Sequence, residues 1–277
     1  MSRLPARTRE ALAGLAAAGA DGFDLAAAAL SLAAVHRPRL DLEPYLRHID
    51  GLAEEAAAYA GPLPKCSLAA DALRQVIALR YGYGVGDSDA VEPEECDLAR
   101  VIDSRAGTAE ALVLLYLAVA DRLEWPARGV DFPPRPMVRL SWAGDRVMLD
   151  PVDRGRLVGA EYLRALLKAD AGIEAELTPQ HHRDMDRLAV LLRLQRGAKL
   201  RYLRQERLAE ALTTVEATLA IDPDSAHLWR EAGLLNARLD DVPAAVAALE
   251  EYLRRGGGGV QRQRATALLQ ELRGRLS

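Results

Sequence analysis

The most constraining feature of this chain is a 34-residue repeat near its C-terminal end. Residues 192–225 align with residues 226–259 so that similar side chains fall at the same place in each copy. The matched pairs are Ala211 with Ala245, Leu200 with Leu234, Leu219 with Leu253 and Leu208 with Val242. A period of this length is typical of a pair of antiparallel helices. The small Ala at one shared offset allows one helix to cross closely over its partner, so the sequence predicts stacked helical hairpins.

The repeat resembles the tetratricopeptide (TPR) pattern, which places Trp, Leu-Gly, Tyr, Ala, Phe and Pro at fixed offsets. The first copy supplies Tyr202, Ala211 and Pro223, and the second supplies Trp229, Gly233 and Ala245. Both copies are incomplete, but they share one register. Because each repeat needs neighbours to bury its apolar face, we expect a further helix over residues 261–273 to cap the end.

Composition and charge narrow the class of protein. The chain has 277 residues and only two cysteines, Cys66 and Cys96, which indicates a reducing compartment rather than a disulfide framework. The longest apolar stretches, Leu25–Val35 and Ala109–Ala120, are too short to span a bilayer, and the polar start lacks the order of a signal peptide. We therefore expect a cytoplasmic protein that does not associate with membranes.

The net charge of −4 is unevenly spread. Residues 187–277 carry 15 Lys/Arg and 11 Asp/Glu, a surplus of four positive charges, while the rest of the chain has 21 basic and 29 acidic residues. The two parts are therefore expected to differ in their partners. The basic surplus is too small to indicate nucleic-acid binding.

The order of elements predicts a mostly helical α+β domain over residues 1–180, followed by an all-α repeat region over residues 186–277. The first part, to about residue 80, reads as helices. An apolar helix over Ala109–Ala120, capped by Thr108, should be buried at the centre. The expected strands form a small antiparallel sheet around a hairpin turn at 142–145, and they cover 128–132, 137–141 and 146–149.

Four segments in this order resemble the SirB-type transglutaminase-like proteins, which join a transglutaminase-like (papain-like) domain to C-terminal TPR repeats. The segments are Leu40–Leu46, Arg105–Tyr116, Leu123–Pro133 and Val147–Pro151. The resemblance covers nearly the whole chain, and it implies a bacterial-type protein of the same two-part organisation. Each motif is short, so the resemblance rests mainly on the order in which the four segments occur.

Active members of the wider superfamily carry a Cys at the start of the buried helix and a His and an Asp on neighbouring strands. In this chemistry the thiolate attacks a carbonyl and the His lowers the thiol pKa. By resemblance, the Cys place falls on Ala109, the His place on Arg135 and the Asp place on Asp150. Ala109 has no nucleophilic atom, and Arg135 cannot act as a base because its pKa stays above about 12. The sequence therefore predicts no catalytic residues and a pseudoenzyme.

Several alternatives stay open at these positions. Cys96 could serve as a relocated nucleophile of a hydrolase or acyltransferase, or it could simply be a small residue packed near the pocket. Asp150 could cap backbone amides at the end of its strand. Arg135 and Asp150 could form an ion pair that fills the former active site, or Arg135 could point outward between its flanking prolines.

No motif predicts a metal or a cofactor. His181 and His182 are adjacent, so they face apart on regular structure, and no Cys or carboxylate stands at ligand spacing. The glycines at 256–259 lack the Lys-Ser/Thr of a phosphate loop, so they are expected to form a break after a helix.

The first helix of each repeat carries a matching face of basic and apolar residues. Spacings of three and four residues place them on one side of a helix. The predicted partner-binding residues are Arg193, Arg196, Leu200, Arg204, His227, Arg230, Leu234 and Arg238. Guanidinium groups bind carboxylates bidentately, so this face suits an acidic segment or the free C-terminus of a protein. The alternative is a solvated face, or one that forms ion pairs with the acidic half of the chain.

These observations favour a non-catalytic binding or regulatory protein with a protein or peptide partner. An enzyme with an unusual nucleophile is the second possibility. A third is a peptide-binding regulator whose former active-site pocket still holds a ligand.

Overall fold

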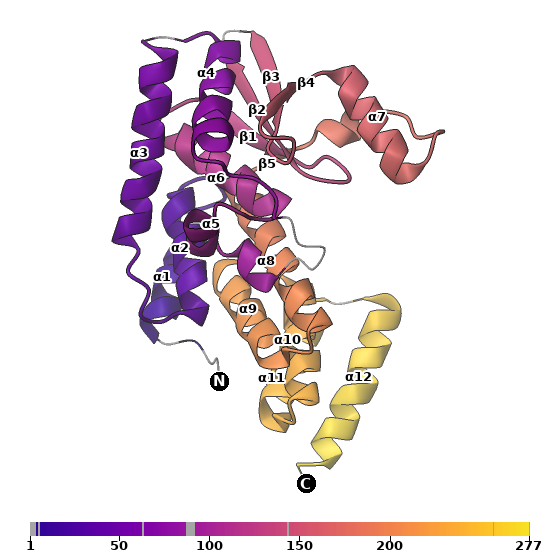
Figure 1. Ribbon diagram of the computed structural model, residues 1–277. Helices are drawn as coiled ribbons and strands as arrows, with labels where there is room; N and C mark the ends of the chain where they lie inside the picture. The colour runs from indigo at the N-terminus through magenta and orange to yellow at the C-terminus, as the bar shows by residue number, and fades with distance from the viewer. Residues whose placement is uncertain are drawn as a thin grey trace. The chain divides into compact units, whose positions relative to one another are not determined.

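The computed structural model describes residue 4 and residues 6–62, 64–86, 92–142, 144–256 and 258–276. Ala143 of the predicted hairpin turn and Gly257 of the predicted glycine break lie outside the described residues. The chain forms two compact units that are interleaved along the sequence (Figure 1). The sheet unit comprises residues 20–33 and 40–194, and the repeat unit comprises residues 1–19, 34–39 and 195–277.

Helices make up most of the sheet unit, as the apolar periodicity predicts. They are α2 (Leu25–His36, of which residues up to 33 belong here), α3 (Glu43–Ala60), α4 (Cys66–Leu73), α5 (Leu98–Ser104), α6 (Ala109–Arg122) and α7 (Ala160–Ala171). Short 3₁₀ turns cover Pro93–Cys96 and Pro179–His182. Helix α4 continues directly as a π-helix over Arg74–Arg80.

The predicted antiparallel sheet is present and has five strands in the order β4-β3-β2-β1-β5. Its strands are β1 (Ala127–Val130), β2 (Met137–Trp142), β3 (Asp145–Asp150), β4 (Arg156–Val158) and β5 (Asp184–Met185). The sequence predicts only the central three. The edge strands β4 and β5 have three and two residues, which is too short for an alternating pattern to be read. The connection from α7 to α8 (Arg187–Arg204) contains β5.

The two faces of the sheet are covered by different helices. Val130 of β1 and Met137 of β2 form one apolar cluster with Leu163 and Leu167 of α7. Because successive residues of a strand face opposite ways, Gly129 points to the other face, and a Cβ built there would lie 3.6 Å from Leu117 of α6. Helix α7 therefore covers one face, while α6 packs on the other.

Helix α6 is the buried helix that the sequence predicts. All residues from Ala111 to Ala120 are buried. The Thr108 hydroxyl accepts a hydrogen bond from the Ala111 amide at 3.3 Å, which confirms the predicted N-cap. Position 109 is thus the first residue of a well-capped central helix.

The repeat unit contains α1 (Ala6–Ala17) and the C-terminal helices (Figure 1), of which the last four, α9 to α12, pack on one another in sequence order. The C-terminal helices are α8 (Arg187–Arg204, from residue 195 in this unit), α9 (Leu208–Ile221), α10 (Ala226–Arg238), α11 (Val242–Arg254) and α12 (Gly259–Gly274). Ala211 and Ala245, the repeated small residues, are both fully buried. Helix α1 packs against α9, and α12 forms where the sequence predicts a capping helix.

Gly233 allows a very close helix contact within the second repeat. A Cβ built at Gly233 of α10 would lie 2.7 Å from Cγ and Cδ2 of Leu249, a fully buried residue of α11. Real side-chain contacts are longer than this, so the glycine is required by packing.

We expect Gly233→Ala to lower the free energy of unfolding. Overpacking a core costs about 1–3 kcal/mol, which offsets the gain of up to about 1 kcal/mol from the better helix propensity of Ala. Gly14→Ala in α1 is the matched control, because nothing lies within 4 Å of a Cβ built there; it should raise stability. Urea unfolding of both variants measures the difference. If both substitutions stabilised the protein equally, the conclusion that packing on Leu249 requires a glycine at position 233 would be wrong.

Candidate functional site

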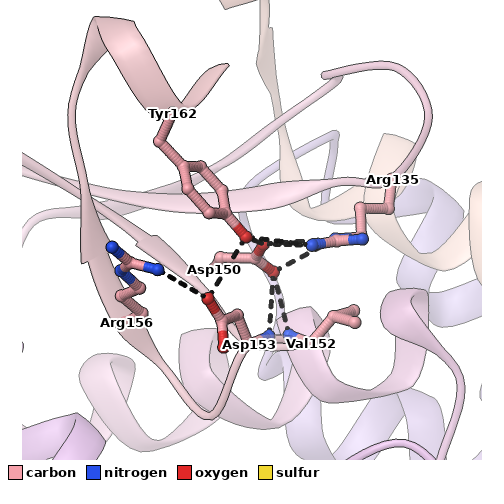
Figure 2. A network of polar contacts seen from close by, with 6 residues as sticks. All are labelled: Arg135, Asp150, Val152, Asp153, Arg156 and Tyr162. Carbon is pink, nitrogen blue, oxygen red and sulfur yellow. Dashed lines mark hydrogen bonds and ion pairs between the residues drawn. The ribbon is translucent and has the colours of Figure 1, made fainter. Parts of the chain in front are cut away.

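Two of the three positions that the resemblance assigns to a catalytic triad, Arg135 and Asp150, belong to one polar network in the sheet unit (Figure 2). The Arg135 Nη2 donates to Asp150 Oδ2 at 2.7 Å, and Nε lies 3.2 Å from the same oxygen. Arg135 precedes β2, and Asp150 ends β3. The predicted ion pair between these two residues is therefore present, and Arg135 does not simply point outward between the prolines.

Asp150 also caps the turn that follows it. Its Oδ1 accepts from the amides of Val152 at 3.0 Å and Asp153 at 3.3 Å. The Tyr162 hydroxyl from α7 donates to Oδ2 at 2.8 Å. Both readings of Asp150, as an ion-pair partner and as a backbone cap, are thus correct at once. The side chain is fully buried, and these donors compensate a charge that would otherwise be very costly to bury.

The electrostatics of the network oppose acid–base chemistry. Burial alone lowers the pKa of Arg135. The hydrogen bond to Asp150 and the charge of Asp150 outweigh that effect, so the pKa of Arg135 lies above its ordinary value. Burial and the Asp150 hydrogen bond raise the pKa of Tyr162 to about 12. Both groups therefore keep their protons at neutral pH.

Ala109, the position that the resemblance assigns to the nucleophile, is the first residue of α6 and has no reactive side chain. Further along α6, the Tyr116 hydroxyl is buried, and no hydrogen-bond partner for it exists among the described residues. Burial raises the pKa of Tyr116 far above its ordinary value. A Cβ built on Gly155, which has φ of +67°, would collide with this hydroxyl, so the phenol fits only against a glycine.

Both cysteines are buried thiols. The Cys96 Sγ lies 4.0 Å from the Thr108 Oγ1, the oxygen that caps α6. Burial and the charge of Asp145 raise the pKa of Cys66. A buried thiol with a raised pKa forms little thiolate, which is the reactive species.

The histidine pair shows local roles. His181 Nδ1 accepts the Thr178 amide at 3.1 Å, and its ring meets Phe132 edge-on. Across the described ranges, no group of three or more His, Cys, Asp or Glu is placed to hold a metal ion. In the same part of the chain, no helix combines the length and apolar character needed to cross a bilayer.

The repeat unit contains a groove of about 510 Å³ between α8, α10 and α12. Three of the predicted partner-binding residues, Arg230, Leu234 and Arg238, line it. The remaining lining residues are Lys199, Leu203, Glu231, Leu235, Ala237, Leu268, Glu271, Leu272 and Arg275. Most of this surface is aliphatic, and its four basic and two acidic side chains leave a surplus of two positive charges.

The other predicted partner-binding residues lie elsewhere. Arg193 belongs to the sheet unit, where it pairs with Asp131 and lies 3.6 Å from Glu110. The exposed residues Arg196, Leu200, Arg204 and His227 do not line the groove. Helix α8 instead contributes Lys199 and Leu203, which lie one residue earlier than the predicted Leu200 and Arg204. The predicted partner-binding residues and the lining of the groove therefore coincide only on α10.

Two functional candidates were not found from sequence. Lys199 occupies the repeat position of Gly233, yet its side chain is buried and its Nζ lies 2.6 Å from the Glu231 carboxylate. A lysine where the repeat pattern favours a small residue was the available signal. Tyr162 was missed because it lies on α7, outside the motifs that matched.

A third cluster stands next to the start of α6. Arg105, at φ of +61°, ends α5, and its guanidinium lies over the Tyr83 ring at 4.7 Å and donates to His48 Nε2 at 2.8 Å. Burial and the charge of Arg105 lower the pKa of His48, which keeps the ring neutral and able to accept this bond. The cluster fixes the loop that leads into position 109.

Comparison with known proteins agrees with this arrangement. The sequence pattern of the transglutaminase-like superfamily matches residues 43–196, and a tetratricopeptide repeat pattern matches residues 198–270. The first match covers more than half of the chain, so the protein belongs to the transglutaminase-like superfamily.

Curated bacterial relatives extend the similarity across both regions. The chain is 26% identical over 248 residues to a UPF0162 protein of Xylella fastidiosa, covering 87% of this chain and 86% of that one. It is 28% identical over 185 residues to protein SirB1 of Salmonella typhimurium, covering 65% and 68%. A crystal structure of menin matches with a TM-score of 0.38 and 10% identity, covering 90% of this chain and 70% of that chain; this likeness is too weak to support an inference.

We expect Arg135→Leu to reduce the free energy of unfolding by about 3–5 kcal/mol, because it leaves the buried Asp150 carboxylate without its counter-charge. Arg156→Leu is the matched control: Arg156 lies 3.4 Å from Asp153 in the same network but is largely exposed, so its loss should cost under about 1 kcal/mol. Guanidinium unfolding of both variants gives the comparison. Similar small losses would show that Asp150 does not depend on Arg135.

Proposed function

We propose that this chain is a non-catalytic binding protein in which a degenerate transglutaminase-like site acts as a structural support and the TPR groove binds an acidic partner segment. The observation that carries the proposal is the groove between α8, α10 and α12, which combines an aliphatic lining with a positive surplus.

The degenerate site supports a loss of catalysis. A nucleophile–base pair needs an attacking atom and a base that releases its proton near neutral pH. Ala109 offers no such atom, and Arg135 holds its proton more tightly than an ordinary arginine. Asp150 is committed to Arg135, Tyr162 and two backbone amides.

The groove supports binding of a carboxylate-bearing peptide. Leu234 is 37% exposed and gives an apolar side chain of a partner a contact surface. Arg238 is exposed, and no ion pair joins it to a carboxylate within the described ranges. Guanidinium groups placed beside an apolar wall recognise an acidic side chain or a terminal carboxylate next to an aliphatic residue. We therefore propose a partner segment that alternates acidic and aliphatic residues or ends in a free carboxylate.

We expect the purified protein to show no hydrolysis or transamidation of glutamine peptides, because neither a nucleophile nor a base is present at positions 109 and 135. A continuous ammonia-release assay, with an active transglutaminase as positive control, measures this. Turnover that persists through purification and disappears in Cys96→Ala would overturn the proposal in favour of a relocated nucleophile.

We expect the double variant Arg230→Glu/Arg238→Glu to lose binding to acidic peptides with free C-termini, measured by fluorescence anisotropy on a peptide set. Affinity for the unchanged protein should fall as salt rises, since exposed charges are screened over about 10 Å at 0.1 M. Unfolding free energy should change little, because surface charges each contribute under about 1 kcal/mol.

Arg196→Glu/Arg204→Glu provides the matched control, because these exposed arginines share the repeat register but do not line the groove. Retained binding in this control, with loss in the groove variant, assigns binding to the groove. Loss in both variants extends the site to the whole predicted face. Normal binding by the groove variant would refute the proposal.

A further inference from the structure

A small pocket of about 210 Å³ opens between α10 and α12 in the repeat unit. Its lining consists of Arg230 and Leu234 of α10 with Gln261, Arg264 and Ala265 of α12. Arg230 and Leu234 also line the TPR groove, so this α10–α12 pocket adjoins the groove directly.

The charge of the α10–α12 pocket differs from that of the groove. In the groove, the Lys199 ammonium group is neutralised by Glu231 at 2.6 Å. The pocket is lined by two arginines and by no acidic residue. Among the described residues, neither Arg230 nor Arg264 has a carboxylate within ion-pair distance. The pocket therefore carries two uncompensated positive charges, and both attract an anion that enters it.

The hydrogen-bond donors of the pocket can be reached from solvent. Arg230 is half-buried and donates from Nη1 to Gln261 Oε1 at 2.8 Å. Its Nε and Nη2 have no partner within the described ranges, and neither atom is buried. Arg264 is exposed and lies three residues after Gln261, so the two side chains share one side of α12. Because Gln261 accepts through Oε1, its amide NH₂ group is a further donor.

The size of the pocket suits one anionic group of a larger ligand. Pockets that hold a whole small molecule have volumes of about 300–1,000 Å³, and this pocket is smaller. A partner segment in the groove contacts Leu234, which lines both hollows. A side chain of that segment can therefore extend into the pocket.

The number of charges favours a phosphate over a carboxylate. A carboxylate carries one negative charge, which leaves one of the two arginines uncompensated. A phosphorylated side chain carries about −1.5 to −2 at pH 7 and offers three strong acceptor oxygens. Guanidinium groups bind phosphate bidentately, and two of them can bind one phosphate group together.

We propose that the α10–α12 pocket binds the phosphate group of a phosphorylated side chain in the partner segment. Arg230 and Arg264 neutralise the phosphate, and the Gln261 amide donates to one of its oxygens. This inference rests on the proposed function of the groove, and it adds that phosphorylation of the partner strengthens the complex.

Fluorescence anisotropy on the full chain tests the proposal with three peptides of alternating glutamate and leucine. They carry serine, phosphoserine or glutamate at one central place and are otherwise identical. We expect the phosphoserine peptide to bind about tenfold or more tighter than the serine peptide, the effect of gaining hydrogen bonds between charged groups. The glutamate peptide should gain less, because it carries one charge.

The ratio of the phosphoserine to the serine affinity locates the phosphate. Arg264→Gln should remove most of this ratio, because Arg264 lines the pocket and does not line the groove. Arg262→Gln is the matched control: it removes the same charge from an exposed position of α12 outside both hollows, and it should keep the ratio.

The outcomes separate this inference from the proposed function. If the serine peptide binds and phosphorylation gives no gain, the inference is wrong and binding by the groove stands; if no peptide binds, both are wrong. A ratio that persists in Arg264→Gln would place the phosphate elsewhere and overturn the inference. So would equal affinity for the glutamate and phosphoserine peptides. Inorganic phosphate should compete only weakly, and binding as tight as that of the phosphopeptide would assign the pocket to free phosphate instead.

Discussion

The buried carboxylate of Asp150 is the constraint on which the sheet unit most depends. A charge without solvent contact must be fully compensated, and here the compensation comes from separate parts of the sequence. Arg135 approaches from the segment before β2, Tyr162 from α7, and the two amides from the turn after β3 (Figure 2). Satisfying one side chain therefore fixes the ends of two strands and the position of a helix.

Under the proposed loss of catalysis, this requirement gives Asp150 a structural role in the transglutaminase-like scaffold. In an active triad, an acidic residue orients a neutral histidine, and the pair is balanced near neutral pH. An arginine in place of the histidine converts the same geometry into a permanent ion pair. The acidic residue then stabilises the fold as the partner of Arg135 and of the two turn amides. The pair supports the proposal of a structural role at this position, and it leaves binding to other surfaces.

Local patterns in the sequence predicted the elements that local physics controls. The apolar run over α6, its Thr108 cap and the β2–β3 hairpin are all expressed within a few residues of one another, and so could be read directly. The Arg135–Asp150 contact was predicted only through resemblance, since 15 residues separate the pair and no periodicity links them. Strands β4 and β5 and the contribution of Tyr162 depend on tertiary contacts that short windows do not contain.

In the TPR region, some residues are the same in the two repeats and others differ. Positions that hold the helices together are the same in both copies, as with the buried Ala211 and Ala245. The position of Gly233 differs: in the second copy it permits close packing on Leu249, whereas in the first it holds Lys199, whose ammonium group pairs with Glu231 at the groove. A buried charged pair costs more to form than an aliphatic contact of the same volume. Under the proposed function, the chemistry of the groove explains Lys199, and departures from the repeat such as this one indicate what the groove recognises.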